Sequence, residues 1–255
     1  MREGFSSAPA PRTWCSLARL FYSRLRTSED DDAVPARPAS APIPLVLHGD
    51  LLDPWCWLAE RRIVIAADEL LGRFLPLDHA PFPRRWDFRA PTSAERRTRA
   101  RELRRAAREP DAPPFSTELW SGNAAGPQSS APALIALAAA RLQGRPAETA
   151  LREALRAAAL VSGVDVSRTD VIMEVAARAG LDLARFVPAF EAPGTERALL
   201  HEIHEARDLG VEDGPALVIN DDWLAAGLRS LRDYRLLLKR YLSKRSGSRV
   251  EHTVH

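Results

Sequence analysis

Cysteine and lysine are both scarce in this chain. Its 255 residues include only Cys15 and Cys56 as cysteines, which excludes a framework of several disulfides and fits a reducing compartment. Lys239 and Lys244 are the only lysines, so nearly all of the 36 basic residues are arginine. Together with the abundant alanine, this indicates a bias in nucleotide composition rather than a surface selected for nucleic acid. The net charge of +2 attracts no partner strongly, and we expect no nucleic-acid partner.

Long apolar runs are also absent. No segment approaches the roughly 18 consecutive apolar residues that span a bilayer, so we expect no membrane partner. Near the N-terminus, Arg2, Arg12, Arg19 and Arg24 interrupt each apolar stretch, which is unlike a secretory signal. We therefore expect a cytoplasmic location.

Sequence motifs for metal or phosphate binding are missing as well. The sequence contains no phosphate-binding loop, nucleophile elbow or zinc-ligand spacing. His201 and His204 stand three residues apart with Glu205 adjacent, yet a metal site needs a third protein ligand and supporting hydrogen bonds. We interpret both histidines as surface residues of a helix and predict no metal site.

Composition divides the chain into two tails and an ordered part. Residues 1–40 combine Ser, Ala, Pro and Arg with the acidic run Glu29–Asp32, and such a segment cannot bury enough apolar surface to order itself. We predict a disordered N-terminal tail there and a polar C-terminal tail over residues 244–255. Over the whole chain, 45% of the residues are hydrophobic, which suffices for a buried core between the tails.

Between the tails, hydrophobic periodicity predicts the order strand, helix, strand, helical block, helix, hairpin, helix. An arginine-rich segment over 94–109 has Leu103 as almost its only large apolar residue, so any helix there is expected on the surface. It is a solvated face or a patch for an anion or a partner. The strands are predicted at Ile43–Leu47, Phe74–Leu77, Ala216–Ile219 and Trp223–Ala226, and the helices at Pro54–Gly72, within 132–190, at Thr195–Leu209 and at Leu228–Leu242.

Two of these helices have recognisable caps. Ser167–Asp170 resembles a capping box, which predicts a helix over Val171–Ala179. Thr195 is expected to cap the next helix, which ends before Gly210.

The most informative segment is Asp50–Trp57, which reads Asp-Leu-Leu-Asp-Pro-Trp-Cys-Trp. It follows a predicted strand and opens a helix, with Asp53 as a good N-cap and Pro54 suited to the first helical position. Cys56 then falls in the first turn, where unpaired amides and the helix dipole favour a thiolate. From these residues alone, Cys56 is a candidate reactive cysteine.

The same segment resembles the active site of the DsbA-like thioredoxin-fold family, which carries Asp-x-x-Cys-Pro-Trp-Cys followed by Trp or Tyr after its first strand. Asp53 occupies the position of the first, nucleophilic cysteine of that family. The residues that match are Asp50, Pro54, Trp55, Cys56 and Trp57.

The resemblance extends over about Ile43–Leu242 and implies an α/β fold, namely a thioredoxin fold with an inserted all-helical domain. Kappa-class glutathione transferases and 2-hydroxychromene-2-carboxylate isomerases share this architecture. It implies a thioredoxin domain formed by residues 41–90 and 193–243, with the helical insertion at 91–192. Further segments that carry the resemblance are Ser129–Leu134, Gln143–Gly144, Ala179–Asp182 and Ala206–Val211.

Pro215 is the second landmark, because it directly precedes a predicted strand. By itself it fits a plain turn proline at a strand entrance. In the family, this position is a cis-proline that faces the redox helix, and the preceding residue presents backbone groups to an extended substrate or to glutathione. Here Gly214 holds that place, where valine or threonine is common, and Asp213 stands where glycine is usual.

Asp53 changes the expected chemistry. Exchange by a two-cysteine site needs an exposed nucleophile of low pKa and a second thiol that resolves the mixed disulfide. The second cysteine of such sites is the more buried, so the pKa of Cys56 should be raised, and the charge of Asp53 should raise it further. We therefore expect dithiol oxidase activity to be lost.

Three functions remain open. In a diverged oxidoreductase, Cys56 works alone with glutathione or a partner thiol. A glutathione-dependent isomerase or transferase is the second, although a carboxylate at Asp53 repels a thiolate. The third is a non-catalytic module that binds a peptide or protein in the groove of the fold, with Asp53 acting as a helix cap.

The site prediction names catalytic and substrate-binding residues, together with the expected cofactor and partner. Cys56 and Asp53 are the candidate catalytic residues. No cofactor is expected apart from glutathione, the partner is a protein thiol, a peptide or a small molecule, and the oligomeric state is left open. The candidate substrate-binding residues are Pro54, Trp55, Gly214 and Pro215.

Overall fold

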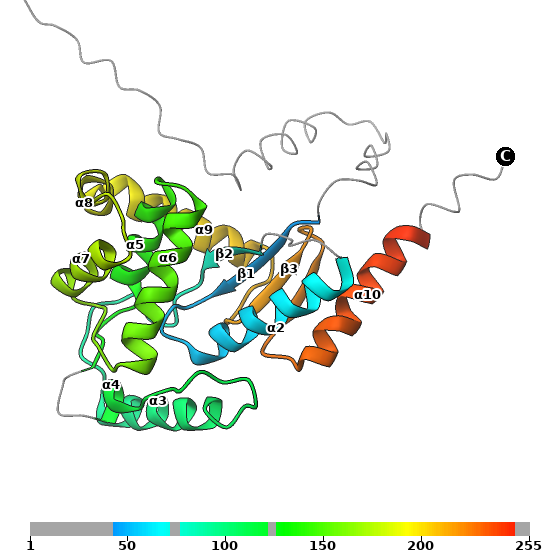
Figure 1. The fold of residues 1–255 in the computed structure, drawn as a ribbon, viewed down its shortest axis with the longest axis horizontal. Helices are drawn as coiled ribbons and strands as arrows, with labels where there is room; N and C mark the ends of the chain where they lie inside the picture. The colour runs from blue at the N-terminus through cyan, green and yellow to red at the C-terminus, as the bar shows by residue number, and fades with distance from the viewer. Residues whose placement is uncertain (1–42, 72–76, 122–125, 248–255) are drawn as a thin grey trace, which may run out of the picture. The chain divides into compact units, whose positions relative to one another are not determined.

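The computed structural model describes residues 43–71, 77–121 and 126–247, and these belong to one compact unit. The expected N-terminal tail, with Cys15, lies outside the described residues. Within them, four strands form one sheet in the order β2-β1-β3-β4 (Figure 1). The strands are β1 (Leu45–Gly49), β2 (Leu77–Pro81), β3 (Ala216–Ile219) and β4 (Trp223–Ala226).

The sheet is mixed, with β1 at its centre. β1 pairs in parallel with β2 and antiparallel with β3, so Leu45 lies between Leu77 and Ile219. This run of apolar residues is buried, as expected of a central strand covered on both faces. The predicted hairpin of β3 and β4 is confirmed. Asn220 and Asp221 at its turn have φ of 53° and 56°, a conformation that Asn and Asp tolerate better than most residues.

Helices cover both faces of the sheet (Figure 1). α2 (Pro54–Leu71) and α10 (Leu231–Gly247) lie side by side on one face and bury a core that includes Ile63 and Tyr234. α9 (Pro193–Asp208) contributes Ala206 to a smaller core that includes Val46 and Val218 of the sheet. The result is a layer of helix, sheet and helix, in which the N-terminus of α2 lies at the end of β1.

The remaining helices follow β2 and precede β3 in the chain. Their core consists largely of Ala and Leu, with alanines of α5 fully buried, which allows α5 and α6 to pack closely. No described helix is both long and apolar enough to cross a bilayer. The elements are α3 (Ser93–Ala106), α4 (Glu118–Ser121), α5 (Ala131–Arg141), α6 (Arg145–Arg156), the π-helical turn η1 (Ala157–Val161), α7 (Thr169–Arg178) and α8 (Leu183–Glu191).

This topology confirms the predicted thioredoxin fold with inserted helices. The strand boundaries differ from the prediction, because hydrogen-bond pairing rather than apolar content sets them. β1 starts and ends two residues later than Ile43–Leu47, and β2 continues to Pro81. Of the predicted second strand, Phe74 and Leu75 lie outside the described residues. The surface helix predicted within 94–109 is α3, which buries only Ala100, Leu103 and Ala106.

Three predictions about helix ends were wrong. α7 begins at Thr169, and Ser167 binds Asp165 through its backbone N–H and its hydroxyl instead of capping the helix. Thr195 lies inside α9, where its hydroxyl donates to the Ala189 carbonyl. α10 continues to Gly247, so residues 244–247 of the predicted polar tail are helical. The capping signals of Ser167 and Thr195 fail because their side chains make other local hydrogen bonds, and α10 is longer because its backbone hydrogen bonds continue past Leu242.

Candidate functional site

The first turn of α2 is organised by Asp53. The Trp55 backbone N–H donates to Asp53 Oδ1 over 2.9 Å, and the Trp57 N–H donates to the Asp53 carbonyl over 3.4 Å. These are the bonds expected of an N-cap residue, and the Asp53 side chain is fully buried. Pro54 follows as the first helical residue and is also buried.

Asp50 holds the turn between β1 and α2 in place. Its Oδ1 accepts the Leu52 N–H over 2.8 Å, and its Oδ2 accepts the Arg84 N–H over 2.8 Å and the Ser130 hydroxyl over 2.6 Å. A buried carboxylate with three donors is well satisfied. It ties the start of α2 to the segment after β2 and to the start of α5.

The Cys56 sulfur is enclosed by two glycines. A Cβ added to Gly49 would lie 2.5 Å from Cys56 Sγ, and one added to Gly214 would lie 3.2 Å from it. Gly214 also faces the Gly49 Cα, at 2.9 Å from such a Cβ, and the Gly214–Pro215 peptide bond is cis. The structure thus brings together Cys56 and the segment before β3, and Cys56 is only 1% exposed.

Burial dominates the electrostatics of this turn. It raises the pKa of the Cys56 thiol well above its ordinary value, and the neighbouring carboxylate of Asp53 raises it further. Burial also raises the pKa of Asp53, to about 6, although the Arg84 guanidinium opposes the shift. Both groups therefore favour their neutral forms more than exposed groups do.

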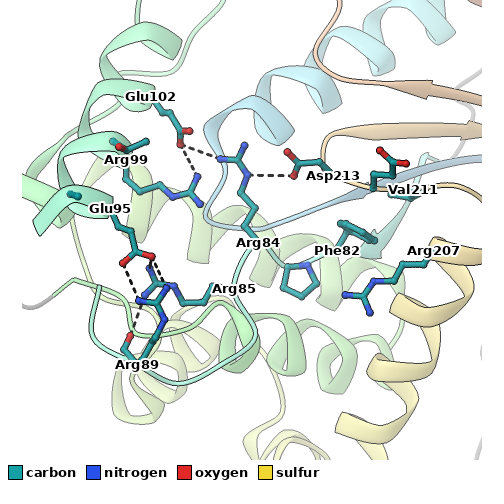
Figure 2. A pocket seen from close by; sticks show the side chains of 14 residues that line it. Phe82, Arg84, Arg85, Arg89, Glu95, Arg99, Glu102, Arg207, Val211 and Asp213 are labelled. Atoms are coloured by element: carbon teal, nitrogen blue, oxygen red, sulfur yellow. Dashed lines mark hydrogen bonds and ion pairs between the residues drawn. The ribbon is translucent and has the colours of Figure 1, made fainter. Parts of the chain in front are cut away.

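Arg84 links this turn to two other segments. Its Nε lies 3.3 Å from Asp53 Oδ2 and 3.6 Å from Asp213 Oδ1, and its Nη1 donates to Glu102 Oε2 over 3.1 Å. Figure 2 shows Glu102, Arg84 and Asp213 in a row from α3 to the loop before β3. Arg84 therefore joins the N-terminus of α2, the arginine-rich helix and the cis-proline loop.

An open groove of about 900 Å³ lies in front of this row. One wall is α3 and the segment after β2, and the other is the end of α9 and the loop before β3 (Figure 2). None of the six predicted site residues lines it. The lining residues are Phe82, Pro83, Arg84, Arg85, Arg89, Ala94, Glu95, Thr98, Arg99, Glu102, Arg207, Val211, Glu212 and Asp213.

A second, much smaller cavity of about 30 Å³ is lined in part by Cys56. Beside it, the mostly covered carboxylate of Glu60 forms ion pairs with Arg152, at 3.4 Å, and with Arg156, and lies 3.1 Å from His79 Nε2. Burial alone would raise the pKa of Glu60, but Arg156 and His79 together lower it far below its usual range. Burial lowers the pKa of His79, so the imidazole is favoured in its neutral form.

The remaining sequence candidates lie away from the groove. The Arg105 guanidinium lies over the Trp55 ring, 5.6 Å from the ring centroid. Trp57 packs edge-on against the Phe115 ring. His201 and His204 are exposed on α9. Across the described ranges, no group of three or more His, Cys, Asp and Glu side chains is placed to hold a metal ion.

Sequence reasoning did not single out Arg84, Glu102 or the pairing of Asp213. Arginine is so abundant in this chain that one more arginine carries no signal. The relevant signal in the sequence is the charge run over 94–109, which indicates a solvated face or a patch for an anion or a partner. Glu102 belongs to this charge run, and from α3 its carboxylate contacts the Arg84 guanidinium.

Comparison with known proteins is consistent with this geometry. A family model described as thioredoxin matches residues 55–233. The structure resembles a candidate protein disulfide isomerase from Nitrosomonas europaea, with a TM-score of 0.70, 19% identity and coverage of 80% of this chain and 99% of that one. A search of curated proteins gave no match.

Two further structures share the fold at lower scores. The cytosolic disulfide reductase DsbM from Pseudomonas aeruginosa, solved with GSH, has a TM-score of 0.60 and 22% identity, covering 78% of this chain and 99% of that one. A 2-hydroxychromene-2-carboxylate isomerase has a TM-score of 0.55 and 15% identity, covering 82% and 99%. At these identities the likeness concerns the fold alone.

Proposed function

This chain belongs to the thioredoxin family and has the fold of DsbA-like proteins, and from that premise we propose that it is a diverged member that binds a ligand and has lost dithiol exchange. The single observation that carries the proposal is the enclosure of the Cys56 sulfur between Gly49 and Gly214. An attacking thiolate must be exposed and of low pKa. Cys56 is buried, and its pKa is raised by that burial.

The residue at the start of the helix supports the same conclusion. Asp53 stands where the resemblance places the first cysteine, and a carboxylate cannot form the mixed disulfide that exchange requires. Its Oδ1 caps α2 and its Oδ2 faces Arg84. The side chain therefore acts in the folded structure as a cap and as the buried end of an ion pair.

Binding is favoured because the groove beside this turn is open. Its walls come from α3 and from the loop that precedes Pro215, and Arg84 connects both walls to Asp53. An extended peptide or a protein segment fits a groove of this kind better than a small molecule that needs a closed pocket. We take a peptide segment of a partner protein as the ligand.

Restoring the missing cysteine tests the proposal. With dithiothreitol as the electron source, the natural protein should not accelerate reduction of insulin disulfides. Asp53→Cys should do so, because it restores the cysteine pair with Cys56, and the helix N-terminus and Arg84 both oppose the effect of burial on the pKa of a thiol at that place. Turnover by the natural protein would contradict the proposal, and an inactive Asp53→Cys variant that still folds would count against the assignment of this turn as the family's active site.

A glutathione-dependent reaction is the second candidate. The observation that favours it is the row of groove arginines, which suits the carboxylates of glutathione, and the DsbM structure contains GSH. Glutathione and S-methylglutathione would raise the unfolding temperature equally if only binding occurs. A larger shift with glutathione, together with its consumption in the presence of an electrophile, would favour the transferase or isomerase.

The compartment is part of the proposal as well. A single buried, unpaired cysteine among the described residues suits a reducing environment. We propose a cytoplasmic location, which cell fractionation with an antibody against the protein tests directly.

A further inference from the structure

We propose that the groove takes an acidic peptide segment, whose carboxylates bind Arg85, Arg89, Arg99 and Arg207. This inference rests on the proposed binding function and specifies the chemistry of its ligand. Arginine binds carboxylates through planar, paired N–H donors. The groove offers this side chain on both of its walls (Figure 2).

The balance of charge on the α3 wall favours an anion. Glu95 accepts two hydrogen bonds from Arg89, of 3.0 and 2.6 Å, and also lies 3.7 Å from Arg85. Glu102 is shared in the same way, at 2.7 Å from Arg99 and 3.1 Å from Arg84. Each carboxylate thus serves two guanidinium groups. This wall has an excess of positive charge and unfilled N–H donors, since a guanidinium carries five.

On the opposite wall, which also carries the carboxylates of Glu212 and Asp213, the Arg207 guanidinium lies over the Phe82 ring, 5.9 Å from the ring centroid. Within the described ranges, no carboxylate lies at ion-pair distance from Arg207. In Figure 2 its side chain extends from α9 toward the groove. A cation–π contact uses the charge of the guanidinium and leaves its N–H donors available to a ligand.

Arg85 shows that these positive charges repel one another. Partial burial lowers its pKa, and the neighbouring Arg89 and Arg99 lower it further, against the opposing effect of Glu95. A carboxylate bound between them would relieve this repulsion. Without a ligand, the α3 wall of the groove therefore has more positive than negative charge.

Arg84 provides a place where a ligand carboxylate can replace one from the protein. Of its three partners, Asp213 is the most distant, at 3.6 Å, and its side chain is 66% exposed. Asp53 is buried and Glu102 is mostly covered, so both stay in place. A ligand carboxylate that displaced Asp213 would enter beside the cis-proline loop.

The spread of the arginines favours a chain with several carboxylates over a single small anion. Four guanidinium groups on two walls of a groove of about 900 Å³ cannot all contact one carboxylate. A peptide with acidic side chains at intervals meets them one at a time. The smaller cavity lined in part by Cys56, by contrast, holds about 30 Å³ and has no room for such a ligand.

Fluorescence anisotropy of the full chain tests the inference. The probe is a fluorescein-labelled decapeptide of alternating Glu and Ala, and its matched control has Gln in place of Glu. We expect the Glu peptide to bind at least tenfold more tightly, with an affinity that falls as NaCl rises. The double variant Arg89→Gln/Arg207→Gln should weaken its binding at least tenfold.

Arg97→Gln/Arg101→Gln is the matched control variant. It removes the same charge from α3 outside the groove, and the affinity should change less than about twofold if the site is local, because neither side chain lines the groove and exposed charges that make no direct contact are weakened by salt. Equal weakening by both double variants would show general attraction to a basic protein and would overturn the inference. Tighter binding of a single-stranded DNA decamer than of the Glu peptide would overturn it as well.

The two proposals fail in different ways. If the Glu and Gln peptides bind equally and the groove variant weakens both, the groove binds peptides without regard to charge, which overturns only the acidic class. If neither peptide binds at millimolar concentration, the binding function itself is contradicted.

Discussion

Arginines lie on both sides of the first half of α2, and they differ in how their charge is satisfied. On the closed side, Arg152 and Arg156 are 6% and 4% exposed and share the carboxylate of Glu60, whose side chain is 15% exposed. On the open side, Arg89 has a side chain that is 51% exposed, and Glu95 serves it and Arg85 together. The same residue type therefore holds the fold together on one side and remains available on the other.

This difference separates a structural ion-pair cluster from the groove that we propose as the binding site. The buried cluster beside Cys56 resembles a structural ion-pair network, whose groups must all be present because an unpaired buried charge is costly. The groove cluster makes bonds that water can replace. The Cys56 thiol lies against the closed side, whereas the groove that we propose as the binding surface is open.

The largest expected effect comes from breaking the closed cluster. Glu60→Gln leaves Arg152 and Arg156 without their shared carboxylate, and the free energy of unfolding should fall by about 3–5 kcal/mol. Urea unfolding followed by circular dichroism measures it. Glu95→Gln in the groove is the control, since glutamine preserves the capping box at Thr92, and its transition midpoint should hardly move. Similar losses in both variants would erase the distinction between the two sides.

Asp53 makes the stability of the buried side depend on pH. Its folded pKa of about 6 exceeds the ordinary value of 3.8, so between these values the folded state binds a proton that the unfolded state lacks. The free energy of unfolding therefore rises as pH falls through that window. At neutral pH, the charged Asp53 carboxylate lowers this free energy by about 3 kcal/mol.

Asp53→Asn keeps the cap and removes the charge. It should therefore raise the free energy of unfolding by up to about 3 kcal/mol at pH 7.5. The gain should shrink toward pH 4, where the natural side chain is protonated. His79 titrates in both proteins, so the difference between the two unfolding curves isolates Asp53. A gain that stays constant from pH 4 to 7.5 would contradict the assignment.

Gly49 tests the enclosure of the sulfur. A methyl group at this position would lie 2.5 Å from Cys56 Sγ, so Gly49→Ala should destabilise the fold by about 1–3 kcal/mol through overpacking. Adding Cys56→Ala should restore part of the loss, because it removes the clashing atom. Gly194→Ala meets no atom within 4 Å and serves as the control. If the double variant is no more stable than Gly49→Ala alone, the clash is not with the sulfur.

The smallest effect on stability is expected from substitutions in the groove. Arg89→Gln should leave the urea midpoint within experimental error, since its partner Glu95 lies at the surface and keeps Arg85 nearby. Its effect should appear only in binding of the acidic peptide. A clear loss of stability would mean that the groove arginines are structural, like those around Glu60.

Much of the fold was predictable because one segment carries its signature. Asp50–Trp57 places a strand end, a turn and a helix start in eight residues, and the resemblance supplied the rest of the topology. Pro215 and Cys56 were expected to lie close together, and Gly214 does lie against the sulfur. The cap predicted at Ser167 was wrong because its hydroxyl donates to Asp165, two residues earlier.

The groove was not predictable from the sequence. Its contacts join residues far apart in the chain, such as Arg84 with Asp213, and spacing shows only partners on one helix or strand. Where arginine is common, composition gives no contrast between a buried arginine such as Arg156 and an exposed one such as Arg89. Burial and shared carboxylates, which distinguish them, exist only in the folded protein.

The most direct test of the account is the reactivity of Cys56 in the folded protein. A Cys15→Ser variant, which leaves Cys56 as the only thiol, is mixed with an aromatic disulfide reagent at pH 7.5, and the released thiolate is followed by absorbance. We expect no labelling over an hour in buffer and complete labelling within seconds in urea. Labelling in buffer within tenfold of the unfolded rate would contradict the claim that this sulfur is sealed.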